Sequence, residues 1–181
     1  GRPVVVQFTN GLQREFDEVV IATHSDDALG MLGDPTESET SVLRALPYRD
    51  NEVILHTDTR LLPKTQRAWS SWNYRLKPGS GRATVTYNMN ILQGLDAPET
   101  FCVTLNDTAS INPHRILGRF NYANPQFTRA GIAAQQRWGD INGQNGTWFC
   151  GAYWQNGFHE DGLTSGLRVA EVQALIRQAP R

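Results

Sequence analysis

The sequence lacks the features that mark several large protein classes. No apolar run approaches the ~20 residues that a membrane-spanning helix needs, so we expect no transmembrane segment. Lys and Arg number 17 and Asp and Glu number 18, which gives a net charge of −1 at pH 7, so nothing favours binding to nucleic acid. The chain also has no internal repeat and no low-complexity segment.

Cysteine is scarce as well. Cys102 and Cys150 lie far apart in sequence, each within an apolar, strand-like run. Two reduced, buried thiols fit this pattern better than a disulfide framework. No spacing of Cys and His matches a zinc site, so we expect no metal. We expect a cytoplasmic protein.

Signatures of nucleophilic catalysis and of dinucleotide binding are missing too. There is no G-x-S-x-G motif and no Ser, His and Asp pattern that indicates a triad, so the catalytic residues stay unknown. No G-x-G-x-x-G lies between a strand and a helix, so the glycine-rich cradle for a dinucleotide pyrophosphate is absent.

The patterns that are present predict a mixed α/β chain. Asn10-Gly11 indicates a hairpin between strands over 3–8 and 12–16. Further strands are predicted over 18–23, 53–57, 69–75, 83–88, 101–105, 115–122 and 148–150, with a turn over 77–81. Helices are predicted over 25–32 with Ser25 as its cap, from a Thr36/Glu39 capping box to 46, and over 127–138.

The segment from Thr147 to Gly166 predicts a strand, a wet aromatic loop and a helix that opens at Asp161-Gly162. The apolar positions of this helix predict a broad buried stripe: Leu163, Leu167, Ala170, Val172 and Leu175. A helix start presents unpaired N–H groups and a positive dipole end. Two interpretations are open: an ordinary helix capped by Asp161, or a site for an anionic or electron-rich group.

This segment resembles the C-terminal flavin-binding segment of the FAD-dependent amine oxidase and phytoene desaturase superfamily. There a strand ends in Phe-Ala-Gly and a helix starts beneath the flavin ring. Here Phe149-Cys150-Gly151 and residues 157–166 stand in those places. Residues 16–24, Phe-Asp-Glu-Val-Val-Ile-Ala-Thr-His, resemble the strand that returns the chain to the FAD domain.

Motifs in the middle of the chain are similar to the bacterial branch of predicted NAD/FAD-binding proteins in that superfamily. They are His-Thr-Asp at 56–58, Trp-Ser-Ser-Trp-Asn-Tyr at 69–74, Thr-Tyr-Asn-Met-Asn at 86–90 and Val-Thr-Leu-Asn at 103–106. Asp107 and Asn124 depart from the pattern, which has Pro and His at those places.

The resemblance implies the C-terminal part of a two-domain flavoprotein that binds FAD. Residues 1–24 and 147–181 would be pieces of the FAD domain, adjacent in space, and 25–146 a sheet-rich substrate domain. The missing N-terminal half would carry the glycine fingerprint. We expect the fragment alone to be inactive, to bind FAD weakly or not at all, and to need that half or a second copy of itself to cover its apolar edges.

The resemblance also implies two sets of contact residues. The flavin contacts would be Thr23, His24, Gly151, Ala152, Phe158, His159, Glu160, Asp161, Gly162 and Leu163, with backbone N–H groups around 161–163 facing the pyrimidine edge of the ring. His159 could stack on the ring, relay a proton or bond a carbonyl. The substrate contacts would be Trp72, Asn73, Tyr74, Tyr87 and Asn90, and the alternative for these residues is a packed sheet with Asn73, Asn88 and Asn90 in a polar network.

The implied activity is an oxidoreductase acting on a small organic or lipid-like substrate. Many amine-oxidising relatives place a Lys near the flavin, but the corresponding stretch here is Asp50-Asn51-Glu52 and the nearest Lys downstream is Lys64. Desaturation, saturation or isomerisation is therefore at least as well supported as amine oxidation. The rival hypothesis is a non-catalytic module that binds lipid or glycan on an aromatic sheet face around Trp72.

Overall fold

The computed structural model describes residues 3–76 and 84–178. The chain divides into two compact units: Gly1–Arg49 with Asn124–Arg181, and Asp50–Ala123. Both helices and strands are abundant, which confirms the α/β class. The turn predicted over 77–81 lies outside the described residues.

The first unit opens with the hairpin that Asn10-Gly11 predicts. Strands β1 (Val4–Gln7) and β2 (Gln13–Phe16) pair antiparallel. Gly11 has φ +84°, a left-handed conformation that glycine adopts without steric cost. The Asn10 side chain accepts a hydrogen bond from the backbone N–H of Leu12, which fixes the turn.

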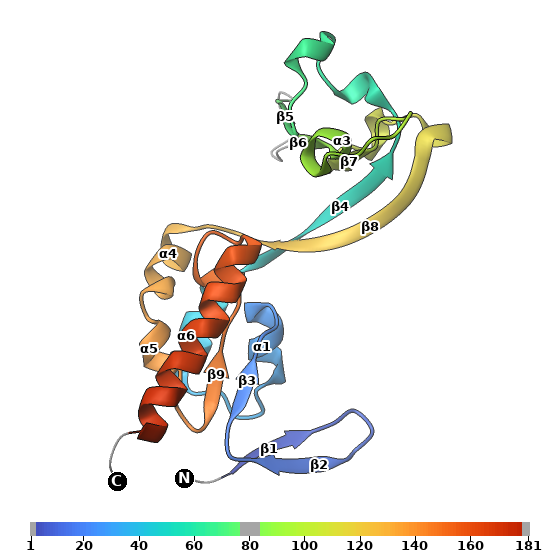
Figure 1. The fold of residues 1–181 in the computed structure, drawn as a ribbon. Coiled ribbons are helices and arrows are strands. Elements are labelled where there is room, and N and C mark those ends of the chain that lie inside the picture. The colour runs from blue at the N-terminus through green and yellow to red at the C-terminus, as the bar shows by residue number, and fades with distance from the viewer. Residues whose placement is uncertain (1–2, 77–83, 179–181) are drawn as a thin grey trace. The chain divides into compact units, whose positions relative to one another are not determined.

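Two strands from opposite ends of the chain pair in parallel. β3 (Val19–Ile21) lies against β9 (Thr147–Phe149) (Figure 1). In this pairing Val20 is opposite Trp148. The Trp148 indole also donates to Glu18, 130 residues earlier in the chain. The prediction that these two segments are adjacent is therefore confirmed.

Short helices pack with this strand pair in one core: α1 (Ser25–Met31), α2 (Glu37–Arg44), α4 (Arg129–Gln135) and α5 (Trp138–Ile141). The Thr36/Glu39 capping box at the start of α2 is confirmed. Ser25 is not a cap, because His24 holds that position and the Ser25 hydroxyl donates to the carbonyl of Leu46. The helix predicted over 127–138 is divided, because the backbone of Arg137 (φ −95°, ψ 18°) leaves the helical region between α4 and α5.

The core of the first unit is built around β9. Trp148, Phe149 and Tyr153 pack with Val42 and Leu43 of α2 and with side chains from α1, α4 and α5. The loop after β9 is therefore not the wet segment that was predicted. A 3₁₀ turn, η5 (Ala152–Trp154), turns Tyr153 and Trp154 into the core, and only 1% of the Tyr153 surface is exposed.

The final helix, α6 (His159–Gln178), begins two residues before the predicted start and buries a different face. It packs through Asp161, Ser165 and Val169, whereas Leu163 and Leu167 are 58% and 52% exposed. At 3.6 residues per turn, the two leucines share a row with Ala170 and Ala174 on the opposite side. The predicted buried stripe is therefore wrong: Leu175 is exposed as well, and of its members only Val172 is partly buried.

The second unit contains most of a sheet of five described strands, of which β4 and β8 extend into the first unit. Within the described residues the strand order is β5-β6-β7-β4-β8, with neighbours β5/β6, β6/β7 and β7/β4 antiparallel. The bounds are β4 (Tyr48–His56), β5 (Trp72–Arg75), β6 (Thr84–Asn88), β7 (Cys102–Leu105) and β8 (Ile116–Pro125). A short helix that the sequence did not predict, α3 (Met89–Gln93), joins β6 to β7. Four 3₁₀ turns complete the unit: η1 (Thr59–Leu61), η2 (Gln66–Ala68), η3 (Thr108–Ser110) and η4 (Pro113–Arg115).

The unit boundaries differ from the expected 24/25 and 146/147. Residues 25–49 and 124–146 belong to the first unit, because α1, α2, α4 and α5 form its core with β9. The chain enters the second unit within β4 and leaves it within β8.

Cys102 and Cys150 are both buried and unpaired, as the sequence predicts. Burial raises the pKa of the Cys102 thiol to about 11, so this group stays protonated near neutral pH. In the described ranges, none of the helices has the length and apolar character needed to cross a bilayer.

Candidate functional site

The carboxyl ends of β3 and β9 meet at one edge of the first unit, which we call the strand-end site. Because the two strands run parallel, Thr23 and His24 leave β3 at the same edge where Gly151 and Ala152 leave β9. In α/β folds, ligands bind outside the carboxyl ends of parallel strands. The structure thus brings together four of the residues that the sequence assigned to cofactor contact.

Gly151 is required by the local packing. A Cβ built on it would lie 2.5 Å from Cε1 of Tyr153, closer than side-chain carbons approach. Its backbone N–H donates to the Ser165 hydroxyl at 3.1 Å, which ties the end of β9 to the second turn of α6. The strand end and the helix are therefore held in one arrangement.

The start of α6 borders the same edge. A Cβ on Gly162 would be 3.9 Å from Ala152, so the first helical turn lies directly beside the end of β9. Phe158, His159 and Glu160 are exposed, as is Leu163. These side chains and the backbone between them are accessible to a ligand.

Asp161 has a structural role at this helix start. Its carboxylate is buried and accepts hydrogen bonds from the backbone N–H groups of Phe158, at 2.8 Å, and Asn156, at 3.1 Å. The N–H of Gly162 already donates to the carbonyl of Phe158. The donors left over by the helix geometry are thus those of residues 159–161, two residues earlier than the expected 161–163.

An aromatic group flanks the strand-end site and includes two residues that the sequence did not single out. The His24 ring stacks on Tyr48 with centroids 4.0 Å apart, and Tyr48 packs edge-on against Tyr153. Burial, with Asp26 and Asp27 nearby, raises the pKa of Tyr48 to about 12. The Tyr153 hydroxyl has no hydrogen-bond partner among the described residues.

His24, Asp26 and Asp27 also bring their ligand atoms within 4.8 Å of one another. These side chains lie at the surface, and two acidic residues in a first helical turn are accounted for by the helix dipole. The cluster is therefore not evidence for a metal.

In the second unit, β5 divides its candidate residues between two faces. Trp72 and Tyr74 are 46% and 67% exposed, and Trp72 packs edge-on against Tyr87 of β6 at 5.8 Å. We call Trp72, Tyr74 and Tyr87 the aromatic face. Asn73 points to the opposite side, as the two-residue period of a strand requires, and it is buried.

The face that carries Asn73 is a buried polar layer. The Thr104 hydroxyl lies 2.7 Å from Nε2 of His56 and 2.8 Å from the Thr86 hydroxyl. His56 Nδ1 accepts the backbone N–H of Asp58, so the ring proton is on Nε2 and is donated to Thr104. Burial lowers the pKa of His56, against the opposing effect of Asp58, and so favours the neutral ring.

Asn73, Asn88 and Asn90 form hydrogen bonds with backbone groups rather than with one another. Asn73 donates to the carbonyls of Ser70 and Thr86. Asn88 caps α3, and Asn90 links the carbonyl of Glu99 to the N–H of Phe101. Their side chains therefore stabilise the local backbone. The buried side-chain network is formed by the hydroxyls of Thr86 and Thr104, which were not predicted as site residues.

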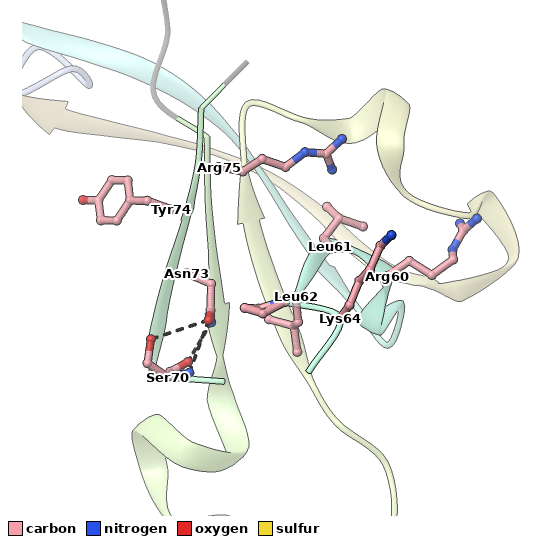
Figure 2. A pocket seen from close by; sticks show the side chains of 9 residues that line it. Arg60, Leu61, Leu62, Lys64, Ser70, Asn73, Tyr74 and Arg75 are labelled. Atoms are coloured by element: carbon pink, nitrogen blue, oxygen red, sulfur yellow. Dashed lines mark hydrogen bonds between the residues drawn. The ribbon is translucent and has the colours of Figure 1, made fainter. Parts of the chain in front are cut away.

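A pocket of about 560 Å³ lies on the Asn73 side of β5. Its rim carries Arg60, Lys64 and Arg75, and its apolar part is formed by Leu61 and Leu62. Figure 2 shows Lys64 and Arg75 on the same side of the strand as Asn73, whereas Tyr74, which also borders the pocket, turns its ring away. We call this the cationic pocket. Its residues come from η1 and the loop after it, and from β5 and the residues just before it, and no periodic pattern connects these segments.

Comparison of the sequence with protein-family models and with curated proteins gives no match.

Proposed function

We propose that the chain is the C-terminal portion of an FAD-dependent oxidoreductase that oxidises, desaturates or isomerises a small organic or lipid-like substrate. The observation that carries the proposal is the parallel pairing of β3 with β9. This pairing brings Thr23, Gly151 and the start of α6 to one edge, where parallel sheets bind cofactors.

The chemistry of that edge suits a flavin. Residues 159–161 offer backbone N–H donors at the positive end of a 20-residue helix. Such donors stabilise the negative charge that develops on a reduced flavin ring, while the cofactor itself supplies the redox chemistry. No side chain of this chain is assigned a catalytic role.

The open surfaces of the first unit support a further piece of the same protein. Parallel sheets occur almost only with both faces covered, yet β3 and β9 form a two-stranded sheet within the described residues and Val20 is exposed. Leu163 and Leu167 of α6 and the hairpin residues Phe8 and Phe16 are exposed as well. Preceding strands with the glycine fingerprint, or a second copy of the chain, would cover them.

The test is the visible spectrum of a longer protein that carries these residues after an N-terminal dinucleotide-binding half. We expect a yellow protein with flavin absorbance. A well-folded, colourless protein that takes up no FAD would refute the proposal.

A matched pair of variants locates the flavin. Gly162→Ala and Gly166→Ala should each stabilise α6 by about 0.5–1 kcal/mol, because neither new Cβ meets an atom closer than 3.9 Å. Only Gly162 lies beside Ala152, so only its variant should lose FAD, by about tenfold or more in affinity. Equal FAD affinity in the two variants would place the flavin elsewhere.

The 181-residue chain alone should bind FAD weakly or not at all. Hydrogen bonds from backbone N–H groups to a charged ligand contribute roughly 1–3 kcal/mol each, whereas association costs an estimated ~4–15 kcal/mol. The few donors at α6 therefore roughly offset the loss of translational freedom. Titration with FAD measures this, and micromolar or tighter binding would show a more complete site.

A non-catalytic lipid- or glycan-binding module is the second candidate, favoured by the exposure of the aromatic face. If it is correct, Trp72→Ala abolishes binding of a glycan or lipid by a protein that holds no flavin. If the flavoprotein proposal is correct, the same variant keeps its yellow colour and is altered only in substrate use.

A further inference from the structure

The cationic pocket combines an apolar part with cationic side chains at its rim. Leu61 and Leu62 are almost completely buried and form its apolar part. Lys64, from the same segment, is exposed at its rim. Its volume of about 560 Å³ falls within the ~300–1,000 Å³ of small-molecule sites.

The charges at the rim are unevenly compensated. Arg60 holds the buried Asp58 carboxylate through both of its oxygens, and its hydrogen bonds keep the pKa of Asp58 well below the usual range. Arg75 lies 3.7 Å from the buried carboxylate of Asp107. Among residues 3–76 and 84–178, no carboxylate lies within ion-pair distance of Lys64, so the rim has a net positive charge centred on this residue.

Hydrogen bonds within the second unit fix the segments that form the wall of the pocket. The Asn73 side chain accepts the N–H of Ser70 and donates both of its protons, to the carbonyls of Ser70 and Thr86 (Figure 2 shows its bonds to Ser70). Trp69 donates to the carbonyl of Pro63 at 2.8 Å, which anchors the segment that carries Lys64. The Ser70 hydroxyl donates to the carbonyl of Trp72 and keeps its lone pairs for another donor.

We propose that the cationic pocket binds an amphiphilic anion, namely a carboxylate or phosphate ester that carries a short alkyl chain. The anion pairs with Lys64 and the outer edge of Arg75, and the alkyl chain lies against Leu61 and Leu62. The pocket lies wholly within residues 50–123, so this proposal does not rest on the flavin proposal and its test needs no cofactor.

The experiment is calorimetric titration of the 181-residue chain with four probes that share one alkyl chain: octanoate, octyl phosphate, octanol and octylamine. Both anions should bind, octanol at least about tenfold more weakly, and octylamine not at all, because a charge-assisted contact is worth about one power of ten in affinity. The two anions also separate a carboxylate site from a phosphate site.

Variants make the result specific. Lys64→Gln should weaken the anions about tenfold and leave octanol unchanged. Arg119→Gln removes another exposed cation, on β8, that does not line the pocket, and should change nothing. Chemical shifts of backbone amides should move at Leu61, Leu62 and Ser70 when octanoate is added.

Three results would overturn the proposal: no binding of either anion at millimolar concentration, equal affinity for octanol and octanoate, or an unchanged Lys64→Gln variant. Shift changes confined to Trp72 and Tyr87 would also overturn it, since those residues lie on the other face of the sheet.

Discussion

Replacing Thr104 by Val isolates the contribution of the buried hydroxyl network. Thr104 is 0% exposed, and its hydroxyl accepts the Nε2 proton of His56 and contacts the Thr86 hydroxyl. Valine keeps the methyl group and nearly the same volume, so the variant removes the hydrogen bonds without opening a cavity.

The magnitude follows from what is left behind. The Nε2–H of His56 loses its acceptor in a dry environment, and a buried unsatisfied donor costs about 1–3 kcal/mol. The contact with Thr86 contributes a further ~0.5–1.5 kcal/mol. We therefore expect Thr104→Val to lower the free energy of unfolding by about 1.5–4.5 kcal/mol.

Thr104→Ser is the matched control, because it keeps the hydroxyl and removes the methyl group. Its cost should be near ~1 kcal/mol, the value of one buried carbon. A Thr86→Val and Thr104→Val double-mutant cycle should give a coupling energy of about 0.5–1.5 kcal/mol.

The assay is denaturant unfolding combined with hydrogen exchange of the β6 and β7 amides, which reports on the sheet even if the two units unfold separately. A Thr104→Val protein as stable as the wild type, or more stable than Thr104→Ser, would refute the reasoning that these hydroxyls stabilise the sheet.

Three further perturbations have defined outcomes. Burial lowers the folded-state pKa of His56 below its unfolded value near ~6.5. The stability that the neutral ring contributes should therefore be present above that pH and be lost as the pH falls towards the folded pKa. In His56→Asn, the free energy of unfolding should depend less on pH across this range. Gly151→Ala should destabilise the first unit by about 1–3 kcal/mol, because the new Cβ collides with Tyr153. Gly139→Ala is the control and should not destabilise the unit, because nothing lies within 4 Å of its new Cβ. Thermal denaturation of the two variants measures the difference. Asn142→Ala should cost about 1–3 kcal/mol and increase the exchange rate of the Phe149 amide, whose N–H the Asn142 side chain accepts at 2.7 Å.

Local chemistry made several elements predictable. Asn10-Gly11 is sufficient for a hairpin because the turn and its flanking strands are adjacent in sequence, and the Thr36/Glu39 spacing defines a helix start for the same reason. The adjacency of β3 and β9 is not local, and it was predicted only from the resemblance of two separate segments to a known arrangement.

The remaining features depend on what packs against each segment. Nothing in the sequence between Gly151 and Gly157 distinguishes aromatic rings that face solvent from rings that enter a core, and η5 decides it by turning Tyr153 inwards. In α6, the packed face carries Asp161 and Ser165 because those side chains bond the preceding loop and the residue Gly151 after β9. The leucines predicted to be buried are more than half exposed. The cationic pocket gathers side chains from a 3₁₀ turn, a loop and a strand, which no sequence period connects.

The division of the first unit between both ends of the chain determines the order in which the protein can fold as it is synthesised. Residues 50–123 are continuous, so the second unit can form while the chain is still emerging from the ribosome. β3 must wait for β9, because β9 follows the whole second unit in the sequence. The same is true of the indole that bonds Glu18 from 130 residues away. Closing so long a loop is slow, and Val20 stays unpaired in the meantime. A stall in translation between the second unit and β9 would therefore leave a folded inserted unit attached to an unpaired, aggregation-prone β3.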